Sequence, residues 1–270
     1  MRKLLPGSVA LIAAGLCGTG VPAVAADLGI EAPSYKAPVP IIRTYDWTGF
    51  YIGGNVGGHW GSDKITTSTD VNFEGLGTAA GAAIDAASPV TLHPEGFIGG
   101  VQAGYNLEGS GGVFGIEVDA NWLGGTASRT LSNIPVISAG DQMTNSVEAT
   151  FLSTLRMRWG TTVISDRSLL FITAGFAFET LKTSDTMGHN GNALITSTSG
   201  STTEPGLTVG AGFEYAITDN ISAKAEYLFV AIKDVNTTIP STGAFADSIG
   251  VTHNYIDQVA RFGLNFKFGG

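Results

Sequence analysis

The chain has 270 residues, with 14 lysines and arginines against 23 aspartates and glutamates, and a formal net charge of −9. This acidic balance argues against a nucleic-acid binder, which needs clustered basic side chains. The single cysteine, Cys17, excludes a disulfide framework and a metal site built from several cysteines. Charged residues are only 14% of the chain, yet beyond its first residues no uncharged apolar run is long enough for a membrane helix.

The first residues have the anatomy of a secretory signal peptide. A short positive region, Met1–Lys3, precedes an apolar stretch from Leu4 to Cys17, and Ala23-x-Ala25 forms a small-residue cleavage motif. Leu16 stands where a lipoprotein would carry a small residue before its cysteine. We predict that residues 1–25 are removed on export. Two bases and no acid leave with them, so the mature chain has 12 basic and 23 acidic residues and a net charge of −11.

A proline-rich segment separates the leader from the first periodic region. It reads EAPSYKAPVPIIRTYD, from Glu31 to Asp46, and shows neither a helical nor a strand period. Proline-rich segments of this kind act as extended spacers. We predict a periplasmic linker over residues 26–46 and one folded domain over residues 47–268.

The domain opens on the glycine-rich stretch DWTGFYIGGNVGGHWG, Asp46 to Gly61, which raises the question of a phosphate-binding loop. A phosphate loop turns into a helix after its glycines, whereas this stretch runs into polar SDKITTSTD. Its residues alternate with period two, which predicts a strand with one face formed by Phe50, Ile52, Val56 and Trp60. We interpret the glycines as relieving crowding in a strongly curved sheet.

The same alternation recurs and predicts eight strands, at residues 50–60, 97–107, 114–122, 149–159, 170–179, 208–215, 223–229 and 261–268. Every second connection is a short turn, at 108–112, 160–168 and 216–220. The others are long and polar, at 62–94, 124–147, 182–204 and 231–253, the first being partly helical in our interpretation. This layout indicates an all-β fold, an eight-stranded antiparallel up-and-down transmembrane β-barrel with its short turns in the periplasm and four long extracellular loops.

Aromatic side chains gather near the ends of the apolar faces, as they do in the interfacial girdles of membrane barrels. They include Phe50, Trp60, Tyr105, Phe114, Trp122, Trp159, Phe213, Tyr215, Phe266 and Phe268. A soluble β-sandwich would explain the alternation equally well, with the apolar faces as its core. It would explain the regular change in loop length and the aromatic ends less well.

The opposite face carries five acids and five bases, namely Glu117, Asp119, Glu179, Glu214, Glu226, Arg156, Arg158, Lys224, Arg261 and Lys267. Eight strands enclose only enough room for side chains, and an unpaired buried charge is costly. We therefore expect these groups to form a hydrogen-bonded charge network that fills the barrel. The alternative is a narrow pore lined by Arg156, Arg158 and Arg261.

Patterns for catalysis and metal binding are weak. Ser153 lies on the outward face between Phe151 and Leu155, without a nucleophile motif. The histidines fall at or beyond the outer strand ends, where we expect solvated loop side chains, and their spacing matches no metal site: His59, His93, His189 and His253. We predict no enzymatic activity, cofactor or metal. Haem capture by loop histidines, tested in a His189/His253 double alanine variant, is the ligand hypothesis that stays open.

Several stretches resemble the small alphaproteobacterial outer-membrane porin-family and immunogenic outer-membrane proteins, within the superfamily of the outer membrane protein A transmembrane domain and the opacity proteins. They are DWTGFYIGGNVGGHWG, GFIGGVQAGYNLE, FGIEVDANW, FLSTLRMRWG, SAKAEYLF and VARFGLNFKF, spread from Asp46 to Phe268. The resemblance implies insertion by the outer-membrane assembly machinery, which reads a C-terminal aromatic strand. Phe268 matches that signal, and Gly269 and Gly270 depart from it.

The residues and the resemblance together predict an outer-membrane barrel with an envelope-structural and surface-exposed role. The expected partners are outer-membrane lipid, lipopolysaccharide and the assembly machinery, with a host or haem ligand possible at the loops and no nucleic acid. A narrow porin for small solutes and a haem-binding or adhesive receptor are the alternative functions.

Overall fold

The computed structural model describes residues 44–69, 82, 85–86, 88–132, 141–189, 193–239 and 249–268. These residues belong to one compact unit that begins at Arg43. The predicted signal peptide, residues 1–25, and most of the predicted linker, residues 26–43, lie outside the described residues. Gly269 and Gly270 lie outside them as well.

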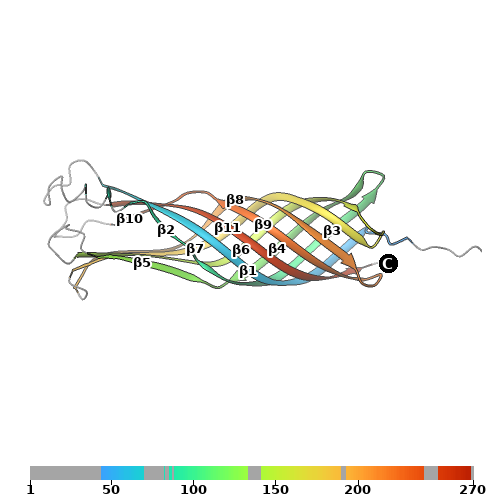
Figure 1. Cartoon of the computed structure of the whole chain (residues 1–270), viewed down its shortest axis with the longest axis horizontal. Coiled ribbons are helices and arrows are strands. Elements are labelled where there is room, and N and C mark those ends of the chain that lie inside the picture. Colours follow the sequence, from blue (N-terminus) through green and yellow to red (C-terminus); the bar gives the residue numbers. More distant parts are fainter. Residues whose placement is uncertain are drawn as a thin grey trace, which may run out of the picture. The chain divides into compact units, whose positions relative to one another are not determined.

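The described residues contain eleven strands in one sheet. Their bounds are Gly49–Thr69 (β1), Val90–Leu92 (β2), Glu95–Gly109 (β3), Gly112–Leu123 (β4), Thr126–Ser132 (β5), Asp141–Thr162 (β6), Ser168–His189 (β7), Ala193–Ala216 (β8), Ile221–Ile232 (β9), Val235–Ile239 (β10) and Ile249–Phe268 (β11). Eight of them pair antiparallel around a ring in the order β1, β3, β4, β6, β7, β8, β9, β11, and β11 closes the ring on β1. Figure 1 shows these tilted strands winding around the barrel. The predicted eight-stranded barrel is confirmed.

Along each strand, exposed side chains on the outside of the barrel alternate with buried side chains on its inside. On β1, Phe50 and Trp60 are 45% and 48% exposed, whereas Tyr51 and Asn55 are buried. The outward side chains on the other strands of the ring are also mostly large and apolar. We call this outward surface the apolar belt. A surface of this kind needs an apolar surrounding, because large contiguous apolar patches are rare on soluble monomers.

Five of the strands are much longer than the sequence predicts: β1, β6, β7, β8 and β11. β7 and β8, with 22 and 24 residues, occupy most of the segment predicted as a loop at 182–204. β5 and the 22-residue β6 occupy parts of the segment 124–147, and β1 and β2 occupy parts of the segment 62–94. β10 and β11 likewise occupy parts of the segment 231–253. The loop prediction was wrong there because the outward face turns from apolar to hydroxyl side chains while the inward face stays apolar, as at Met143, Val147 and Leu181. A strand above the belt needs only one apolar face.

We call the part of the barrel beyond the belt the outer extension. It consists of β2, β5 and β10 with residues 61–69, 141–149, 181–189, 193–205 and 249–257 of the long strands. Its interior is an apolar core to which Ile65, Val90, Leu92, Met143, Val147, Leu181, Val235, Ile249 and Val251 contribute. The core continues toward the middle of the barrel through Ile98, Leu152, Leu228 and Val259.

Glycine is required where neighbouring strands approach most closely. A Cβ atom added to Gly57 would overlap the backbone carbonyl oxygen of Ala260 on β11, and one added to Gly53 would overlap that of Leu264. Both positions face inward, where the ring is narrow. The interpretation of the glycine-rich opening as a curved strand is therefore confirmed.

In the described residues, helical backbone is limited to Ala82, Asp85 and Ala86, in the connection between β1 and β2. No helix among the described residues is long and apolar enough to cross a membrane.

Candidate functional site: the barrel interior

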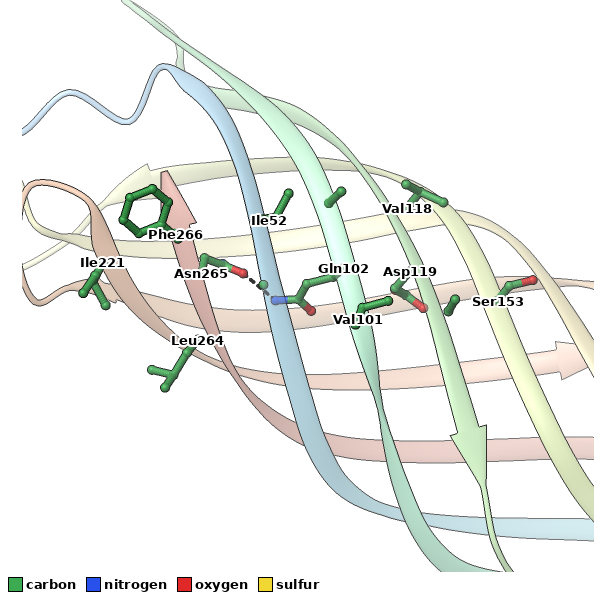
Figure 2. A pocket seen from close by; sticks show the side chains of 13 residues that line it. Ile52, Val101, Gln102, Val118, Asp119, Ser153, Ile221, Leu264, Asn265 and Phe266 are labelled. Carbon is green, nitrogen blue, oxygen red and sulfur yellow. Dashed lines mark hydrogen bonds between the residues drawn. The ribbon is translucent and has the colours of Figure 1, made fainter. Parts of the chain in front are cut away.

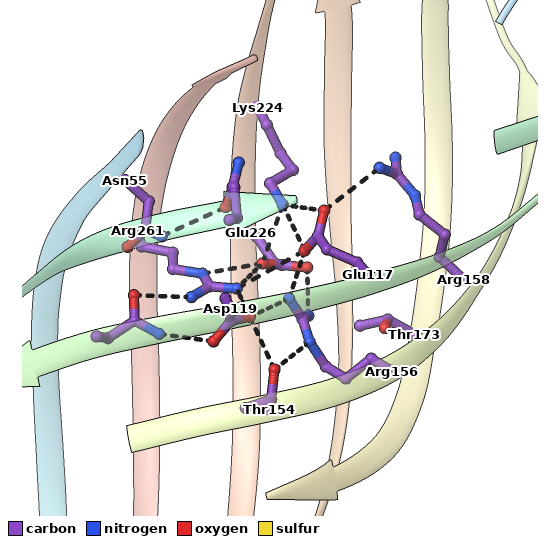
Figure 3. Close-up of polar contacts among 12 residues, drawn as sticks. Asn55, Glu117, Asp119, Thr154, Arg156, Arg158, Thr173, Lys224, Glu226 and Arg261 are labelled. Atoms are coloured by element: carbon purple, nitrogen blue, oxygen red, sulfur yellow. Dashed lines mark hydrogen bonds and ion pairs between the residues drawn. The ribbon is translucent and has the colours of Figure 1, made fainter. Parts of the chain in front are cut away.

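Arg156, on β6, is the centre of a charge network inside the ring (Figure 3). Its side chain is fully buried, and its guanidinium contacts three carboxylates. Nη2 lies 2.5 Å from Glu117 Oε1 and 2.8 Å from Asp119 Oδ2, and Nη1 lies 2.7 Å from Glu226 Oε1. Its Nε–H donates to the hydroxyl of Thr154 at 2.9 Å. A buried guanidinium is stable only when its donors are satisfied in this way.

Glu117, on β4, joins cations from two sides of the ring. Lys224 Nζ, on β9, lies 2.8 Å from both of its carboxylate oxygens. The hydroxyl of Tyr51, on β1, donates to Glu117 Oε2 at 2.6 Å. Because the partners come from β1, β6 and β9, this carboxylate ties together strands that are not neighbours in the ring.

Arg261 and Arg158 extend the network across the barrel. Arg261, on β11, donates to Asp119 Oδ2 at 2.9 Å and to Glu226 Oε2 at 2.7 Å. Arg158 donates to Glu214 Oε2 at 2.6 Å, and its guanidinium carbon lies 4.1 Å from the ring centroid of Phe171. Charge-assisted bonds and a cation–π contact of this kind hold a guanidinium in one orientation.

Eight of the ten charged residues chosen from the sequence meet in this network: Glu117, Asp119, Arg156, Arg158, Glu214, Lys224, Glu226 and Arg261. Four acids thus face four bases, and the network is neutral. The other two chosen residues lie elsewhere. Glu179 is buried nearer the outer extension, and Lys267 lies at the short-turn end, where its Nζ donates to the backbone oxygen of Asp46.

Neutral side chains complete the network, and the choice of charged residues from the sequence missed them. Tyr51 and Thr154 bond directly to charged members. Asn121, Ser222 and Asn265 donate to carboxylates of the network as well, and Gln102 donates to Asn265. All of them face inward in the alternation of their own strands, which is the signal that could have identified them.

An aromatic pair closes the short-turn end of the barrel. Trp47 is buried, its backbone N–H donates to Glu108, and its indole N–H donates to the carbonyl oxygen of Asp166 at 2.9 Å. The ring of Tyr45 packs edge-on against it, with centroids 4.9 Å apart. Burial, together with the charge of Glu214, raises the pKa of the Tyr45 phenol to about 12. The chain entering the barrel therefore covers this end of the ring.

Two histidines lie inside the barrel and not in solvated loops, so the prediction for them was wrong. His59 is buried, with Nδ1 3.0 Å from Asp257. His253 is also buried, with Nδ1 2.7 Å from Asp63 and Nε2 3.6 Å from Asp185. His59 shares the inward face of the predicted strand 50–60, near its end, whereas His253 faces inward from a segment that the sequence analysis assigned to the loop 231–253. His253 is therefore not presented to an external haem.

The protonation of His253 follows from its carboxylate neighbours. The residue pairs in register with Ile65, beyond the last belt aromatic of β1, so it belongs to the outer extension. Burial by itself lowers the pKa of the imidazole. Asp185 and Asp63 outweigh burial and raise the pKa to about 9. The imidazolium is consequently the form that holds these two carboxylates together near neutral pH.

A hollow with a volume of about 810 Å³ lies on the outer wall (Figure 2). Belt side chains line it, among them Ile52, Val101, Val118, Leu264 and Phe266, and Ser153 lies at one edge. The inward Gln102 and Asn265 form a hydrogen bond of 2.6 Å behind it. Because the hollow belongs to the belt, it is part of the surface that meets an apolar surrounding.

A closed antiparallel ring with an apolar belt and a polar, packed interior defines a membrane-spanning β-barrel. A comparison with known protein families leads to the same class of protein, because residues 12–268 match the outer membrane protein β-barrel domain. The chain belongs to this family and is an outer-membrane protein.

Relatives with high coverage carry related names. The 31 kDa outer-membrane immunogenic protein of Brucella melitensis is 32% identical over 247 residues, which is 91% of this chain and 93% of that protein. The 25 kDa outer-membrane immunogenic protein of Brucella canis is 26% identical and covers 97% of this chain and 98% of its own length. The 22 kDa outer membrane protein of Rhizobium leguminosarum is 27% identical, covering 85% and 82%.

Solved outer-membrane proteins also align with the chain. OprG of Pseudomonas aeruginosa covers 84% of this chain and 99% of its own, with a TM-score of 0.48 and 11% identity. Neisserial surface protein A covers 82% and 98%, with a TM-score of 0.38 and 14% identity. These scores are too low to support an argument, so the barrel assignment rests on the strand pairing of this chain.

Proposed function

We propose that this protein is a structural, non-conducting barrel of the outer membrane that displays its outer extension at the cell surface. The observation that carries this proposal is the filled interior. The neutral charge network occupies the ring around Arg156, whose side chain is fully buried. The apolar residues Ile98, Leu152, Leu228 and Val259 follow it toward the outer extension.

The two layers oppose ion flow for different reasons. In the charge layer, the donors and acceptors of Arg156, Glu117 and Asp119 are engaged with one another, so an ion would have to break buried bonds. Beyond the charge layer, an ion would pass mostly apolar side chains, with buried Glu179 and the bonded pair His59 and Asp257 among them, and would lose most of its hydration. Eight-stranded rings have little further room. The packed interior therefore favours the structural role over the narrow pore.

The outer surface supports the proposed partners. The apolar belt, with the hollow of Figure 2, suits membrane acyl chains. Above it, the outer extension presents hydroxyl side chains, among them Thr126, Ser146 and Ser184, at the level of the lipopolysaccharide sugars. Phe268 ends β11 next to Phe50, with ring centroids 5.7 Å apart, and is the proposed signal for the assembly machinery. We propose no catalytic role and no cofactor.

Single-channel recording in a planar bilayer tests the proposal, with heat-modifiable gel migration of the same refolded sample as the folding control. We expect folded protein and no discrete steps. Reproducible steps whose ion selectivity changes in Glu226→Gln, which alters the network by one charge, would show a water-filled path and overturn the non-conducting role. Ser153→Ala, on the outer wall, is the matched variant that should behave as wild type in either case.

A further inference from the structure

One outward face of the outer extension carries serine and threonine side chains in register across four strands. The pairing of β5, β6, β7 and β8 aligns two neighbouring rows of outward residues. The row nearer the belt consists of Thr126, Glu148, Lys182 and Ser201. The row above it consists of Ser128, Ser146, Ser184 and Ser199. We call these two rows the hydroxyl wall.

The hydroxyl wall has no net charge, although the chain is acidic. It holds one acid and one base, whereas the whole chain has 23 acidic and 14 basic residues. The strands do not need hydroxyl side chains here, because their inward face supplies the apolar core through Met143, Val147 and Leu181. The fold therefore does not dictate the composition of this outward face.

A hollow with a volume of about 370 Å³ lies on the hydroxyl wall. Seven of the eight wall residues line it, together with Thr183 and Gly200. The short serines of the upper row lie next to the longer Glu148 and Lys182 of the lower row, which accounts for the recess. Pockets for small ligands have volumes of about 300–1,000 Å³. The lining residues include no aliphatic or aromatic side chain, so the hollow does not suit an acyl chain.

The serine hydroxyls at the hollow are not engaged with one another. Beside the wall, hydroxyls bond to each other across neighbouring strands, as those of Thr180 and Thr203 do at 2.8 Å. Ser146, Ser184 and Ser199 form no such side-chain hydrogen bond to any described residue. Each of these hydroxyls therefore has a donor and two acceptor positions for water or a ligand.

Glu148 and Lys182 keep most of their bonding capacity as well. Lys182 Nζ lies 3.7 Å from Glu148 Oε2, which is too far for a hydrogen bond, and the two side chains are 54% and 39% exposed. A surface ion pair of this kind contributes little to stability. The carboxylate accepts hydrogen bonds and the ammonium group donates up to three, so the pair offers both roles side by side.

These adjacent opposite charges favour sugar hydroxyls over an anion. A phosphate attracted by Lys182 would lie close to the carboxylate of Glu148, which repels it. On a sugar ring, one hydroxyl donates to Glu148 while the next accepts from Lys182, and further hydroxyls bond to the serines. The wall therefore suits a saccharide that is recognised through its hydroxyl groups.

The place of the wall identifies the source of the saccharide. On β7, Phe178 belongs to the apolar belt, and Lys182 is the second outward residue beyond it. In the outer membrane, the wall therefore lies beside the sugar layer of lipopolysaccharide, close to the lipid. We propose that the hydroxyl wall binds sugar hydroxyls of the surrounding lipopolysaccharide, with Glu148 and Lys182 as the pair that orients them. This inference rests on the proposed function and names the part of the lipopolysaccharide that the outer extension binds.

The probe is the water-soluble polysaccharide that mild acid releases from the lipopolysaccharide of the producing bacterium. It is titrated by calorimetry onto protein refolded in phosphatidylcholine nanodiscs, and saturable binding is the expected result. Periodate oxidation followed by borohydride reduction opens sugar rings at adjacent hydroxyls without adding charge. The treated polysaccharide should bind about tenfold more weakly or worse, because it no longer holds adjacent hydroxyls in a fixed geometry.

Two double variants test the wall from the side of the protein. Glu148→Ala with Lys182→Ala removes the orienting pair and should weaken binding about tenfold. Lys64→Ala with Glu95→Ala makes the same charge change at exposed residues of β1 and β3 and should bind as wild type does. Heat-modifiable migration confirms that both variants are folded.

The proposal is overturned if the untreated polysaccharide does not bind, if periodate treatment leaves binding unchanged, or if the two double variants bind alike. None of these outcomes depends on conductance. The single-channel recording therefore tests the proposed function separately from this inference.

Discussion

Replacing Arg156 with methionine keeps much of the side-chain length but removes the cation that Glu117, Asp119 and Glu226 share at 2.5, 2.8 and 2.7 Å. The network then holds four acids and three bases in a buried site. Removing one partner of a buried ion pair costs about 3–5 kcal/mol, because the charge left behind is neither solvated nor paired. This is a large part of the free energy of unfolding of a typical domain, which is about 5–15 kcal/mol.

The compensating change is Glu226→Gln, which restores three acids against three bases. In the double variant, Asp119 keeps Arg261 at 2.9 Å and Glu117 keeps Lys224 at 2.8 Å. We expect the double variant to be more stable than the sum of the single effects by about 2 kcal/mol.

The assay is urea titration in detergent micelles, followed by tryptophan fluorescence and by the fraction of protein that migrates as folded. A loss of less than about 1 kcal/mol in Arg156→Met, or additive effects in the double variant, would refute the view that Arg156 is the centre of the network.

Three further predictions concern other layers of the barrel. His253 has its pKa raised to about 9 from an ordinary value of 6.5, so its stabilisation is fully present below about pH 6.5 and lost as pH rises through 9. The loss is on the order of 3 kcal/mol, and urea midpoints measured across this range should become independent of pH in His253→Gln. Gly57→Val forces a side chain onto the backbone of Ala260 and should cost about 3 kcal/mol or more; normal folding yields on gels would contradict this. Trp47→Ala removes a buried indole and its bond to Asp166, and should lower stability by about 3–5 kcal/mol; an unchanged urea midpoint would show that the aromatic pair does not seal the barrel.

Within the belt, the sequence alone determined most of the fold. Strict alternation places Phe50 and Trp60 outside and Tyr51 inside, and the period of a strand allows only these two faces. Short turns alternate with long connections along the chain, and this alternation indicates antiparallel neighbouring strands in an up-and-down barrel. The inward parity of Arg156 and Glu117 likewise follows from their own strands. These properties are local, so they can be read from a few neighbouring residues.

Only the tertiary structure decided what lies above the belt and which charges meet. The segment from 182 to 204 is polar enough to be taken for a loop. Its described residues belong to β7 and β8, because Leu181 and its neighbours pack against residues distant in sequence. Glu179 shares the inward parity of Glu117 but lies outside the network, since depth in the barrel depends on strand tilt and register around the whole ring. His253 becomes an imidazolium partner because β1, β7 and β11 bring Asp63 and Asp185 to it. Whether a side chain faces inward or outward is decided within its own strand. Its level along the barrel axis and the residues it contacts depend on how all eight strands close into the ring.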